Sequence, residues 1–265
     1  MTSRTTTGYR TNLASIAIQL DQAEASGSPI EQFNDSLSIE DAYYVQKKLL
    51  SLRRERGEQI TGAKLGFTSK AKMEQMGVSE VIAGFLTDRM LIESGSKLSL
   101  SHLVHPRVEP EIAFRFGQEI QPGADLDEII GSIDAVAPAL EIIDSRYRNF
   151  SFSLSDVVAD NTSACRYTVG EWVDFNTNLA GHAVTMLVDG TVVETGSTSA
   201  ILGDPMLALE AFARMNQRHG TTLPVGSVLL AGAATAAIAL VPSSRVTAVV
   251  AGLGTVELEI SGAEA

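Results

Sequence analysis

The chain has 265 residues, of which 45% are hydrophobic and 20% are charged, and its net charge is −12 at pH 7. Such an acidic surface repels nucleic acid and anionic lipid, which argues against both as partners, and an anionic substrate would need a local cation. A single cysteine, Cys165, excludes an internal disulfide, and the N-terminus lacks an apolar run typical of a signal peptide, so we expect a cytoplasmic protein.

Two helices are predicted at the start of the chain. Residues 8–25 carry apolar side chains at helical spacing. A second helix should begin after Ser38, which opens a capping pattern, and should end near Gly57. We therefore expect a helical N-terminal portion, residues 1–57, followed by a β-rich catalytic core, residues 58–265.

Short apolar segments separated by turns follow the helices, which is typical of strands. Asp189-Gly190 predicts a β-hairpin, and one further helix is expected between Asp204 and Gly220. Because strands and helices do not alternate regularly, a doubly wound parallel sheet is not expected. The predicted strands are 60–67, 97–100, 109–116, 135–143, 183–188, 191–194, 227–230, 247–250 and 255–260.

Three glutamates are the first candidates for a functional site. Glu109 and Glu111 are two residues apart in a predicted strand, so their carboxylates should share a face and repel unless a cation or a proton lies between them. Glu141 is the one charge in the apolar run 136–143. Carboxylates with no His or Cys nearby favour a hard cation, Mg²⁺ or Mn²⁺. The alternative is an exposed strand face with glutamates in water.

Other polar residues stand in unusual positions. Lys64 is the one charge in a Gly-rich apolar segment, and is either a functional cation or an edge lysine that reaches solvent. Asp88 closes an apolar segment, as a functional acid or as a turn residue. Asp160, Asn161 and Ser163 have short polar side chains suited either to a tight loop over a ligand or to Asx turns.

Together these residues resemble the fumarylacetoacetate hydrolase-like superfamily, in its branch of hydratases and decarboxylases of meta-cleavage aromatic catabolism. The resemblance covers nearly the whole chain, and the glutamate triplet at this spacing is quite specific for the superfamily. The motifs that carry it are Lys64–Ser69, Pro106–Glu111, Pro138–Glu141, Val158–Asn161 and Gly252–Val256.

Several stretches resemble the decarboxylases of this branch more than its hydratases. Two positions depart from the usual pattern of the family, with Phe67 in place of Leu and Pro110 in place of Ala. A proline removes a strand N–H, so this strand should lie at a sheet edge or lack a partner there. The decarboxylase-like stretches are Ala71–Gly77, Gly84–Asp88, Asp144–Phe150 and Thr235–Ala237.

The resemblance implies an α+β fold, with a mixed β-roll or barrel core of the fumarylacetoacetate hydrolase type and an N-terminal helical portion. It implies Mg²⁺ or Mn²⁺ held by the three glutamates, Lys64 as a cation near the substrate's carboxylate and oxo oxygens, and Asp88 as an active-site acid. It also implies a homo-oligomer and an association with a homologous hydratase. Substrate-binding residues are expected at Thr68, Asn161, Ser163 and Thr235.

The implied reaction is the metal-dependent decarboxylation of 2-oxohex-3-enedioate to 2-hydroxypenta-2,4-dienoate and CO₂. A hydratase acting on 2-hydroxypenta-2,4-dienoate is the nearest alternative, because it would use the same metal and dienolate. A carbon–carbon hydrolase of the superfamily commonly uses a His–Glu pair after the lysine strand, and residues 69–88 contain no His. The last alternative is a catalytically silent, metal-stabilised subunit that scaffolds a partner enzyme. Such a subunit would need neither Lys64 nor Asp88.

Overall fold

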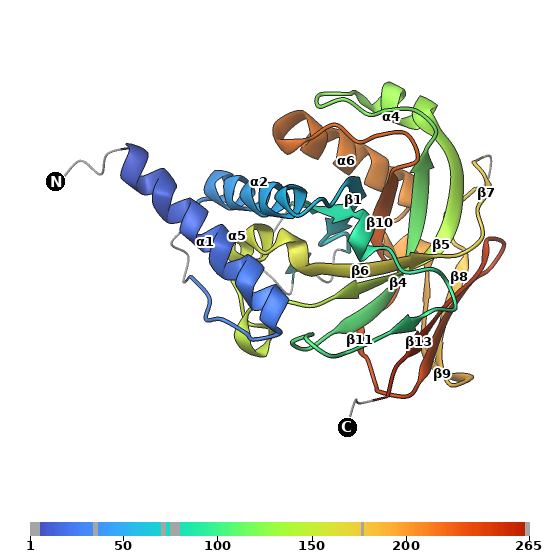
Figure 1. Cartoon of the computed structure of the whole chain (residues 1–265). Coiled ribbons are helices and arrows are strands. Elements are labelled where there is room, and N and C mark those ends of the chain that lie inside the picture. Colours follow the sequence, from blue (N-terminus) through green and yellow to red (C-terminus); the bar gives the residue numbers. More distant parts are fainter. Residues whose placement is uncertain (1–5, 34–36, 70–72, 75–79, 176–177, 263–265) are drawn as a thin grey trace.

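The N-terminal part of the described chain consists of two α-helices, α1 (Thr6–Ser26) and α2 (Ile39–Glu55), which lie side by side (Figure 1). The hydroxyl of Ser38 caps α2 by accepting a hydrogen bond from the N–H of Asp41. Both predicted helices are therefore confirmed. The computed structural model describes residues 6–33, 37–69, 73–74, 80–175 and 178–262.

Within these residues, a mixed sheet of eight strands forms the centre of the molecule (Figure 1). Its strands are β1 (Ile60–Gly66), β2 (Ile82–Thr87), β4 (Arg107–Phe116), β5 (Ile133–Ile143), β6 (Ala164–Val169), β7 (Val173–Asp174), β10 (Val228–Ala233) and β11 (Ile238–Ala239). The strand order is β2-β1-β10-β4-β5-β6, with β11 beside β4 and β7 beside β5. β1 and β10 are parallel, and the other neighbours are antiparallel. The sheet curls until β6 contacts β2, so one of its faces is concave.

A second sheet, of five strands in the described chain, packs on the outer face of the first. Its strands are β3 (Lys97–Leu98), β8 (Ala183–Val188), β9 (Thr191–Ser197), β12 (Arg245–Val250) and β13 (Gly254–Ile260), in the order β3-β13-β12-β8-β9. Asp189 and Gly190 form the predicted hairpin turn between β8 and β9. The buried side chains of Val108, Leu140 and Ile142 belong to the apolar cluster between the two sheets. The opposite face of β4 and β5 carries charged residues as well as the small side chains of Ala113 and Ala139.

Three more α-helices are described outside the sheets. α6 (Pro205–His219) begins after the cap Asp204 and ends before Gly220, as predicted. α4 (Leu126–Ser132) and α5 (Leu154–Ala159) were not predicted. Each is too short for a helical pattern of apolar residues to repeat, and capping boxes fix where they begin.

Pro110 lies in β4, which is a central strand of the large sheet. Its carbonyl accepts a hydrogen bond from the N–H of Ala234, so its nitrogen points to the same side, towards the connection between β10 and β11. β10 ends at Ala233 and β11 begins at Ile238, so no ladder bond is lost at the proline. The expected edge position is wrong, and the strand has a partner at Pro110, because Leu140 of β5 is in register with it. Only on the side of the proline nitrogen is no strand residue paired with it.

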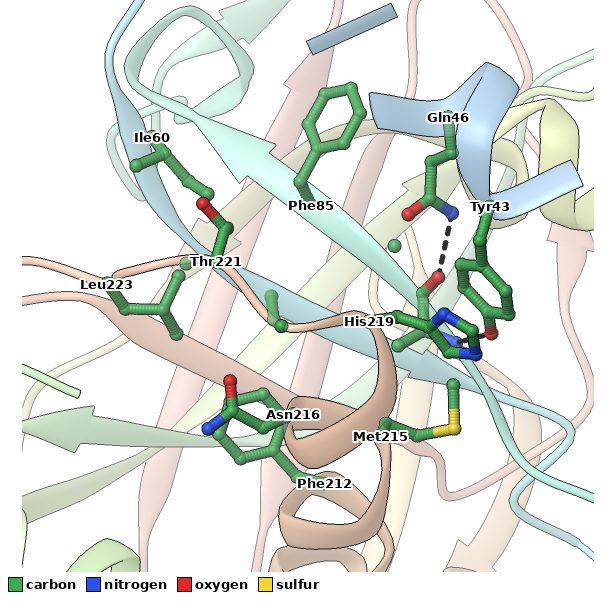
Figure 2. A pocket seen from close by; sticks show the side chains of 15 residues that line it. Tyr43, Gln46, Ile60, Phe85, Phe212, Met215, Asn216, His219, Thr221 and Leu223 are labelled. Carbon is green, nitrogen blue, oxygen red and sulfur yellow. Dashed lines mark hydrogen bonds between the residues drawn. The ribbon is translucent and has the colours of Figure 1, made fainter. Parts of the chain in front are cut away.

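The free edge of β2 is covered by side chains from distant segments. The hydroxyl of Tyr43 accepts a hydrogen bond from the N–H of Ala83, whose carbonyl accepts one from the amide of Gln46 (Figure 2). The amide of Asn161 likewise pairs with both backbone groups of Phe85. These hydrogen bonds pair the backbone groups of Ala83 and Phe85 on the free edge of β2, and they hold α2 and residue 161 against this strand.

The architecture is α+β, with a curled mixed sheet and N-terminal helices, which confirms the predicted fold class. The division into residues 1–57 and 58–265 stays a prediction. Hydrogen bonds from Tyr43 and Gln46 to Ala83 join α2 to β2 across this boundary. No helix in the described part of the chain is long and apolar enough to cross a membrane.

Candidate metal and substrate site

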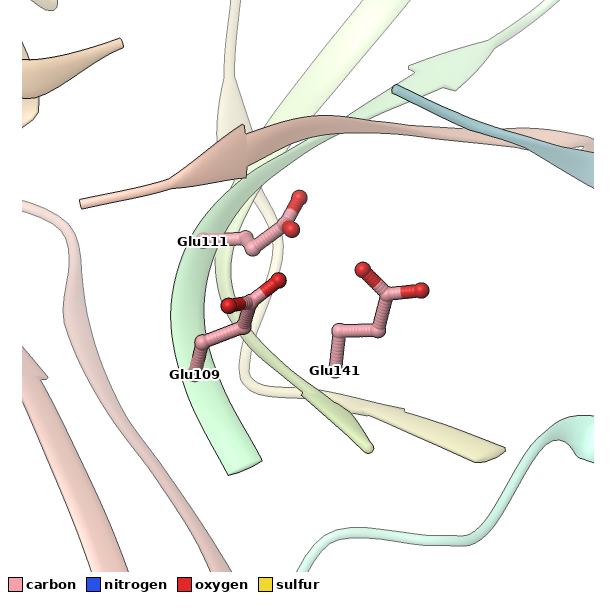
Figure 3. Close-up of side chains that lie close together, drawn as sticks. All are labelled: Glu109, Glu111 and Glu141. Atoms are coloured by element: carbon pink, nitrogen blue, oxygen red, sulfur yellow. The ribbon is translucent and has the colours of Figure 1, made fainter. Parts of the chain in front are cut away.

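The three predicted glutamates meet on the concave face of the large sheet (Figure 3). Glu109 and Glu111 are alternate residues of β4, so they share a face, and Glu141 on β5 lies directly opposite Glu109. One carboxylate oxygen from each residue lies within 4.8 Å of the others. The expected convergence of these side chains is confirmed, whereas their action as ligands stays a prediction.

Two of the carboxylates are fully buried, which makes the site electrostatically costly without a cation. Glu111 and Glu141 are each 0% exposed. Burial, together with the charges of Glu141 and Glu109, raises the pKa of Glu111 well above its ordinary value. The Oε2 atom of Glu111 accepts a hydrogen bond of 2.6 Å from the N–H of Gly232. Within the described chain, Oε1 of Glu111 and Oε1 of Glu141 have no hydrogen-bond partner, and an oxygen-binding dication fits this donor set.

Lys64 on β1 supplies a fixed positive charge beside the glutamates. Its Nζ lies 3.0 Å from Oε2 of Glu141 and donates a 3.2 Å hydrogen bond to the carbonyl of Thr162. Burial would lower the pKa of Lys64, but the carboxylates of Glu141, Glu109 and Glu111 raise it above its ordinary value. Lys64 is therefore charged at neutral pH, and the functional interpretation is preferred to that of a surface lysine.

A tight turn, η3 (Asn161–Ser163), holds the carbonyl that contacts Lys64. All three residues of the turn have positive φ, between 51° and 57°, a conformation that costs about 1–2 kcal/mol at each non-glycine residue. Within the described chain, the buried hydroxyls of Thr162 and Ser163 have no hydrogen-bond partner. Substrate binding by Ser163 stays a prediction. Both ends of the Asn161 amide are bound to β2, so this residue holds the turn in place.

A buried ion pair supports the turn from behind. Asp160 and Arg146 are both almost completely buried and form an ion pair, and the N–H of Arg146 also donates to Asp160. Burial raises the pKa of Asp160 to about 7, although Arg146 opposes this rise. The guanidinium also donates to the carbonyls of Asp144 and Ala164. Arg146 thus joins the segments on both sides of the turn.

Gly84 on β2 allows the turn to approach the strand. A Cβ atom at this position would lie 2.7 Å from the carbonyl oxygen of Asn161 and 3.2 Å from Cδ of Lys64. We expect Gly84→Ala to lower the free energy of unfolding by about 1–3 kcal/mol, because the added methyl group would be too close to the Asn161 carbonyl. The variant should also reduce turnover, because the methyl group displaces the side chain of Lys64. Thermal unfolding and initial rates measure both effects.

The matched control for this prediction is Gly131→Ala. Gly131 lies in α4, and a Cβ there would meet nothing within 4 Å. Alanine favours a helix over glycine by about 0.5–1 kcal/mol, so this variant should be as stable as the wild type or more so. If Gly84→Ala were as stable and active as Gly131→Ala, the close packing of the turn against β2 would contribute to neither stability nor turnover.

The other predicted substrate-binding residues are Thr68 and Thr235, which follow β1 and β10. Thr68 is buried just beyond the end of β1, and a Cβ atom at Gly232 would lie 1.9 Å from its Oγ1. Thr68 therefore touches the residue that hydrogen-bonds Glu111. Thr235 lies in the connection between β10 and β11, where its hydroxyl donates to the carbonyl of Ala236. Their contact with substrate stays a prediction.

Asp88 does not join this site. It begins the turn η1 (Asp88–Met90), where its exposed carboxylate accepts hydrogen bonds from the N–H groups of Gln59 and Arg89. The β2 residue in register with Lys64 is Gly84, which lies four positions, or about 13 Å, along the strand from Asp88. Asp88 therefore lies at the opposite end of β2, and the turn-residue interpretation describes its contacts. An active-site role for it has no support in this geometry.

Sequence reasoning missed three residues of the site. Gly84 and Gly232 make close backbone contacts, and Thr162 supplies the carbonyl that binds Lys64. A glycine inside a predicted strand often marks such a close approach, which was the available signal. The decarboxylase-like stretch Ala71–Gly77 falls mostly outside the described residues.

A separate cavity of about 60 Å³ lies between α2, the C-terminal end of α6, β1 and β2 (Figure 2). Its lining is mainly apolar and aromatic, and His219 stacks on Tyr43 with ring centroids 3.9 Å apart. Burial and the charges of Lys47 and Arg218 lower the pKa of His219, so the ring is neutral at pH 7. None of the three glutamates lines this cavity, which is therefore distinct from the glutamate site.

The chain is similar to known proteins over most of its length. A family model described as fumarylacetoacetate (FAA) hydrolase C-terminal matches residues 63–261, which include Lys64 and the three glutamates. The chain is 45% identical to a 4-oxalocrotonate decarboxylase of Pseudomonas sp. over 252 residues, which cover 94% of this chain and 98% of the relative. It is 32% identical to a 2-hydroxyhexa-2,4-dienoate hydratase of Comamonas testosteroni over 239 residues, covering 88% and 90%.

A solved structure agrees with the sequence comparison. The 4-oxalocrotonate decarboxylase from Pseudomonas putida G7, complexed with magnesium and adipate, matches this structure with a TM-score of 0.89. The two are 35% identical, and the match covers 95% of this chain and 98% of the other. This chain therefore has the same fold as a protein whose solved structure contains a magnesium ion and a dicarboxylate.

Proposed function

The chain belongs to the fumarylacetoacetate hydrolase family, and we propose that it is a metal-dependent carboxy-lyase that converts 2-oxohex-3-enedioate (4-oxalocrotonate) to 2-hydroxypenta-2,4-dienoate and CO₂. The observation that carries the proposal is the convergence of three glutamates and Lys64 on the concave face of the sheet. The decarboxylase of Pseudomonas sp. is 45% identical to this chain, whereas the hydratase of Comamonas testosteroni is 32% identical. Such a reaction belongs to meta-cleavage catabolism of aromatic compounds.

The residues of the site fit the charge changes of this reaction. Breaking the bond between C5 and the C6 carboxylate releases CO₂ and leaves an electron pair on C5, which delocalises through the C3–C4 double bond to the C2 oxygen. A Mg²⁺ ion held by Glu109, Glu111 and Glu141 would supply positive charge beside the C1 carboxylate and C2 oxygen. Protonation of the dienolate at the C2 oxygen then gives the dienol.

The chain's own groups orient and stabilise the substrate. Lys64 adds a second positive charge near the C2 oxygen, and the Glu141 carboxylate and the Thr162 carbonyl prevent its ammonium from moving. Because Lys64 is buried, its positive charge is screened less by water than the charge of a surface lysine would be. The buried hydroxyl of Ser163 offers a donor for a substrate oxygen. Residues 162 and 163 are thus preorganised before the substrate binds.

The test of this proposal is the release of CO₂. We expect purified protein with Mg²⁺ and 2-oxohex-3-enedioate to release one CO₂ for each substrate consumed, because the distal carboxylate is lost as a neutral molecule. Chelation of the metal should stop the reaction, and added Mg²⁺ should restore it. Substrate loss without CO₂, or activity confined to 2-hydroxypenta-2,4-dienoate, would assign the chain to the hydratases.

We also propose that the protein forms a homo-oligomer and associates with a homologous hydratase in the cytoplasm. Exposed apolar side chains on the second sheet, at Val192, Val193 and Val249, support a surface that a partner covers. Sedimentation of the protein with and without a purified hydratase tests both associations. A monomer at all concentrations would contradict the first, and independent sedimentation of the two proteins would contradict the second.

A further inference from the structure

The concave face of the large sheet opens to solvent at one end. Along β4, exposure rises from the buried Glu111 through the half-buried Glu109 to the exposed Arg107. On β5, Glu141 is buried and Ile143, two residues further, is half-buried. The C-terminal ends of β1 and β10, which lie at this same end, also become more exposed. A substrate whose oxo-acid end lies at the glutamates therefore extends outwards past Arg107.

Arg107 is placed to meet the outer end of such a substrate. It shares a face of β4 with Glu109 and Glu111, because alternate strand residues point to one side. Its guanidinium carbon lies 4.8 Å from the centroid of the Phe150 ring. This cation–π contact holds the guanidinium through the ring, and the N–H groups of an arginine can bind a carboxylate through two hydrogen bonds.

We propose that Arg107 binds the distal carboxylate of the substrate and so selects dicarboxylic over monocarboxylic 2-oxo acids. Arg107 and Glu109 are about 7 Å apart along the strand, and the end carbons of an extended six-carbon chain are about 6 Å apart. A protein with a net charge of −12 needs a local cation for a second carboxylate, since Lys64 is already paired with Glu141. The proposal rests on the proposed function and names the group that recognises its substrate class.

Because the reaction removes the carboxylate that Arg107 binds, Arg107 should affect KM and not raise kcat. The distal carboxylate is charged in the bound substrate but becomes neutral CO₂, so its attraction to Arg107 weakens as the bond breaks. An interaction that favours the bound substrate over the transition state lowers KM without raising kcat. Arg107→Gln should therefore raise KM about 10-fold or more and leave kcat unchanged or slightly higher.

Calorimetric binding to the Mg²⁺-loaded protein separates recognition from turnover. The probes are adipate, which has two carboxylates, and hexanoate, which has the same chain length and one. We expect Arg107→Gln to weaken adipate binding about 10-fold or more and to change hexanoate binding less than about 2-fold. Arg107→Lys keeps the charge but not the fork of donors, so its effect on adipate should be intermediate.

Arg115→Gln is the matched control. Arg115 lies on the same face of the same strand, about 26 Å away, and its guanidinium carbon lies 5.1 Å from the centroid of the Trp172 ring. It should not change the binding of either ligand. The proposal is overturned if the wild type does not prefer adipate, or if Arg107→Gln leaves adipate binding unchanged or weakens both ligands equally. Arg107-dependent adipate binding without CO₂ release would reject the proposed reaction and keep this binding site.

Discussion

Glu111→Gln is expected to reduce Mg²⁺-dependent CO₂ release by about 1000-fold or more, equivalent to about 4 kcal/mol of transition-state stabilisation. Glu111 is fully buried, and its Oε1 atom has no hydrogen-bond partner in the described chain. A glutamine can keep the hydrogen bond from Gly232 but brings no negative charge to a dication. Assays at saturating substrate with increasing Mg²⁺ measure the loss.

The same variant should respond differently to metal in a stability measurement. Mg²⁺ at 100 times its dissociation constant should raise the free energy of unfolding of the wild type by about 2.7 kcal/mol. We expect this rise to be largely absent in Glu111→Gln. Without metal, however, the variant should be at least as stable as the wild type, because one of three mutually repelling carboxylates is gone.

The pH dependence of the metal-free protein follows from Glu111. Its pKa is raised above the ordinary value of 4.5 in the folded state, so the folded protein holds a proton that the unfolded chain releases. The stability from this proton is present below the unfolded pKa and is lost as the pH rises through the folded pKa. The wild type should therefore lose stability relative to Glu111→Gln across that range, while its Mg²⁺ affinity increases as the proton leaves.

Glu93→Gln, which changes an exposed glutamate outside the site, is the control for these measurements. It should retain wild-type activity, Mg²⁺ response and pH profile. Wild-type turnover in Glu111→Gln, or an unchanged stabilisation by Mg²⁺, would show that this carboxylate does not hold the metal. Greater stability of the metal-free wild type would contradict the electrostatic account.

Much of the fold could be predicted because local signals mark it. The Ser38 cap, the Asp189-Gly190 turn and the Asp204 cap each mark an element that the structure contains. The alternation of side chains along a strand is enough to predict that Glu109 and Glu111 share a face. Glu141 stands out as the one charge of an apolar run, but its place opposite Glu109 depends on how β5 pairs with β4. The family resemblance supplied the fold class.

The missed features depend on contacts between distant parts of the chain. β2 is a short strand whose free edge is satisfied by side chains of α2 and η3, and no local pattern shows such contacts. The binding of Lys64 to the Thr162 carbonyl requires three successive residues with positive φ, and of these only Asn161 is a residue type that often adopts it. Asp88 was matched by its place in the sequence, but the direction of β2 carries it away from the glutamates.

Lys64→Met is expected to lower kcat by about 100- to 1000-fold, which is typical for the removal of one preorganised group that stabilises developing charge. The substitution also removes the cation 3.0 Å from the buried carboxylate of Glu141. Breaking a buried pair costs about 3–5 kcal/mol, so the metal-free variant should unfold at a clearly lower denaturant concentration. Saturating Mg²⁺ should restore part of this stability because it neutralises the carboxylates.

Stability and catalysis can therefore be separated at this residue. Lys64→Met combined with Glu141→Gln removes both partners, so the double variant should regain most of the stability lost in Lys64→Met while remaining inactive. Lys97→Met, on an exposed position of β3, should change neither property. If Lys64→Met were as stable as Lys97→Met without metal, the buried pair would be worth little. If it kept wild-type kcat with saturating Mg²⁺, the charge of Lys64 would have no part in the reaction, and the metal would be left to stabilise the dienolate.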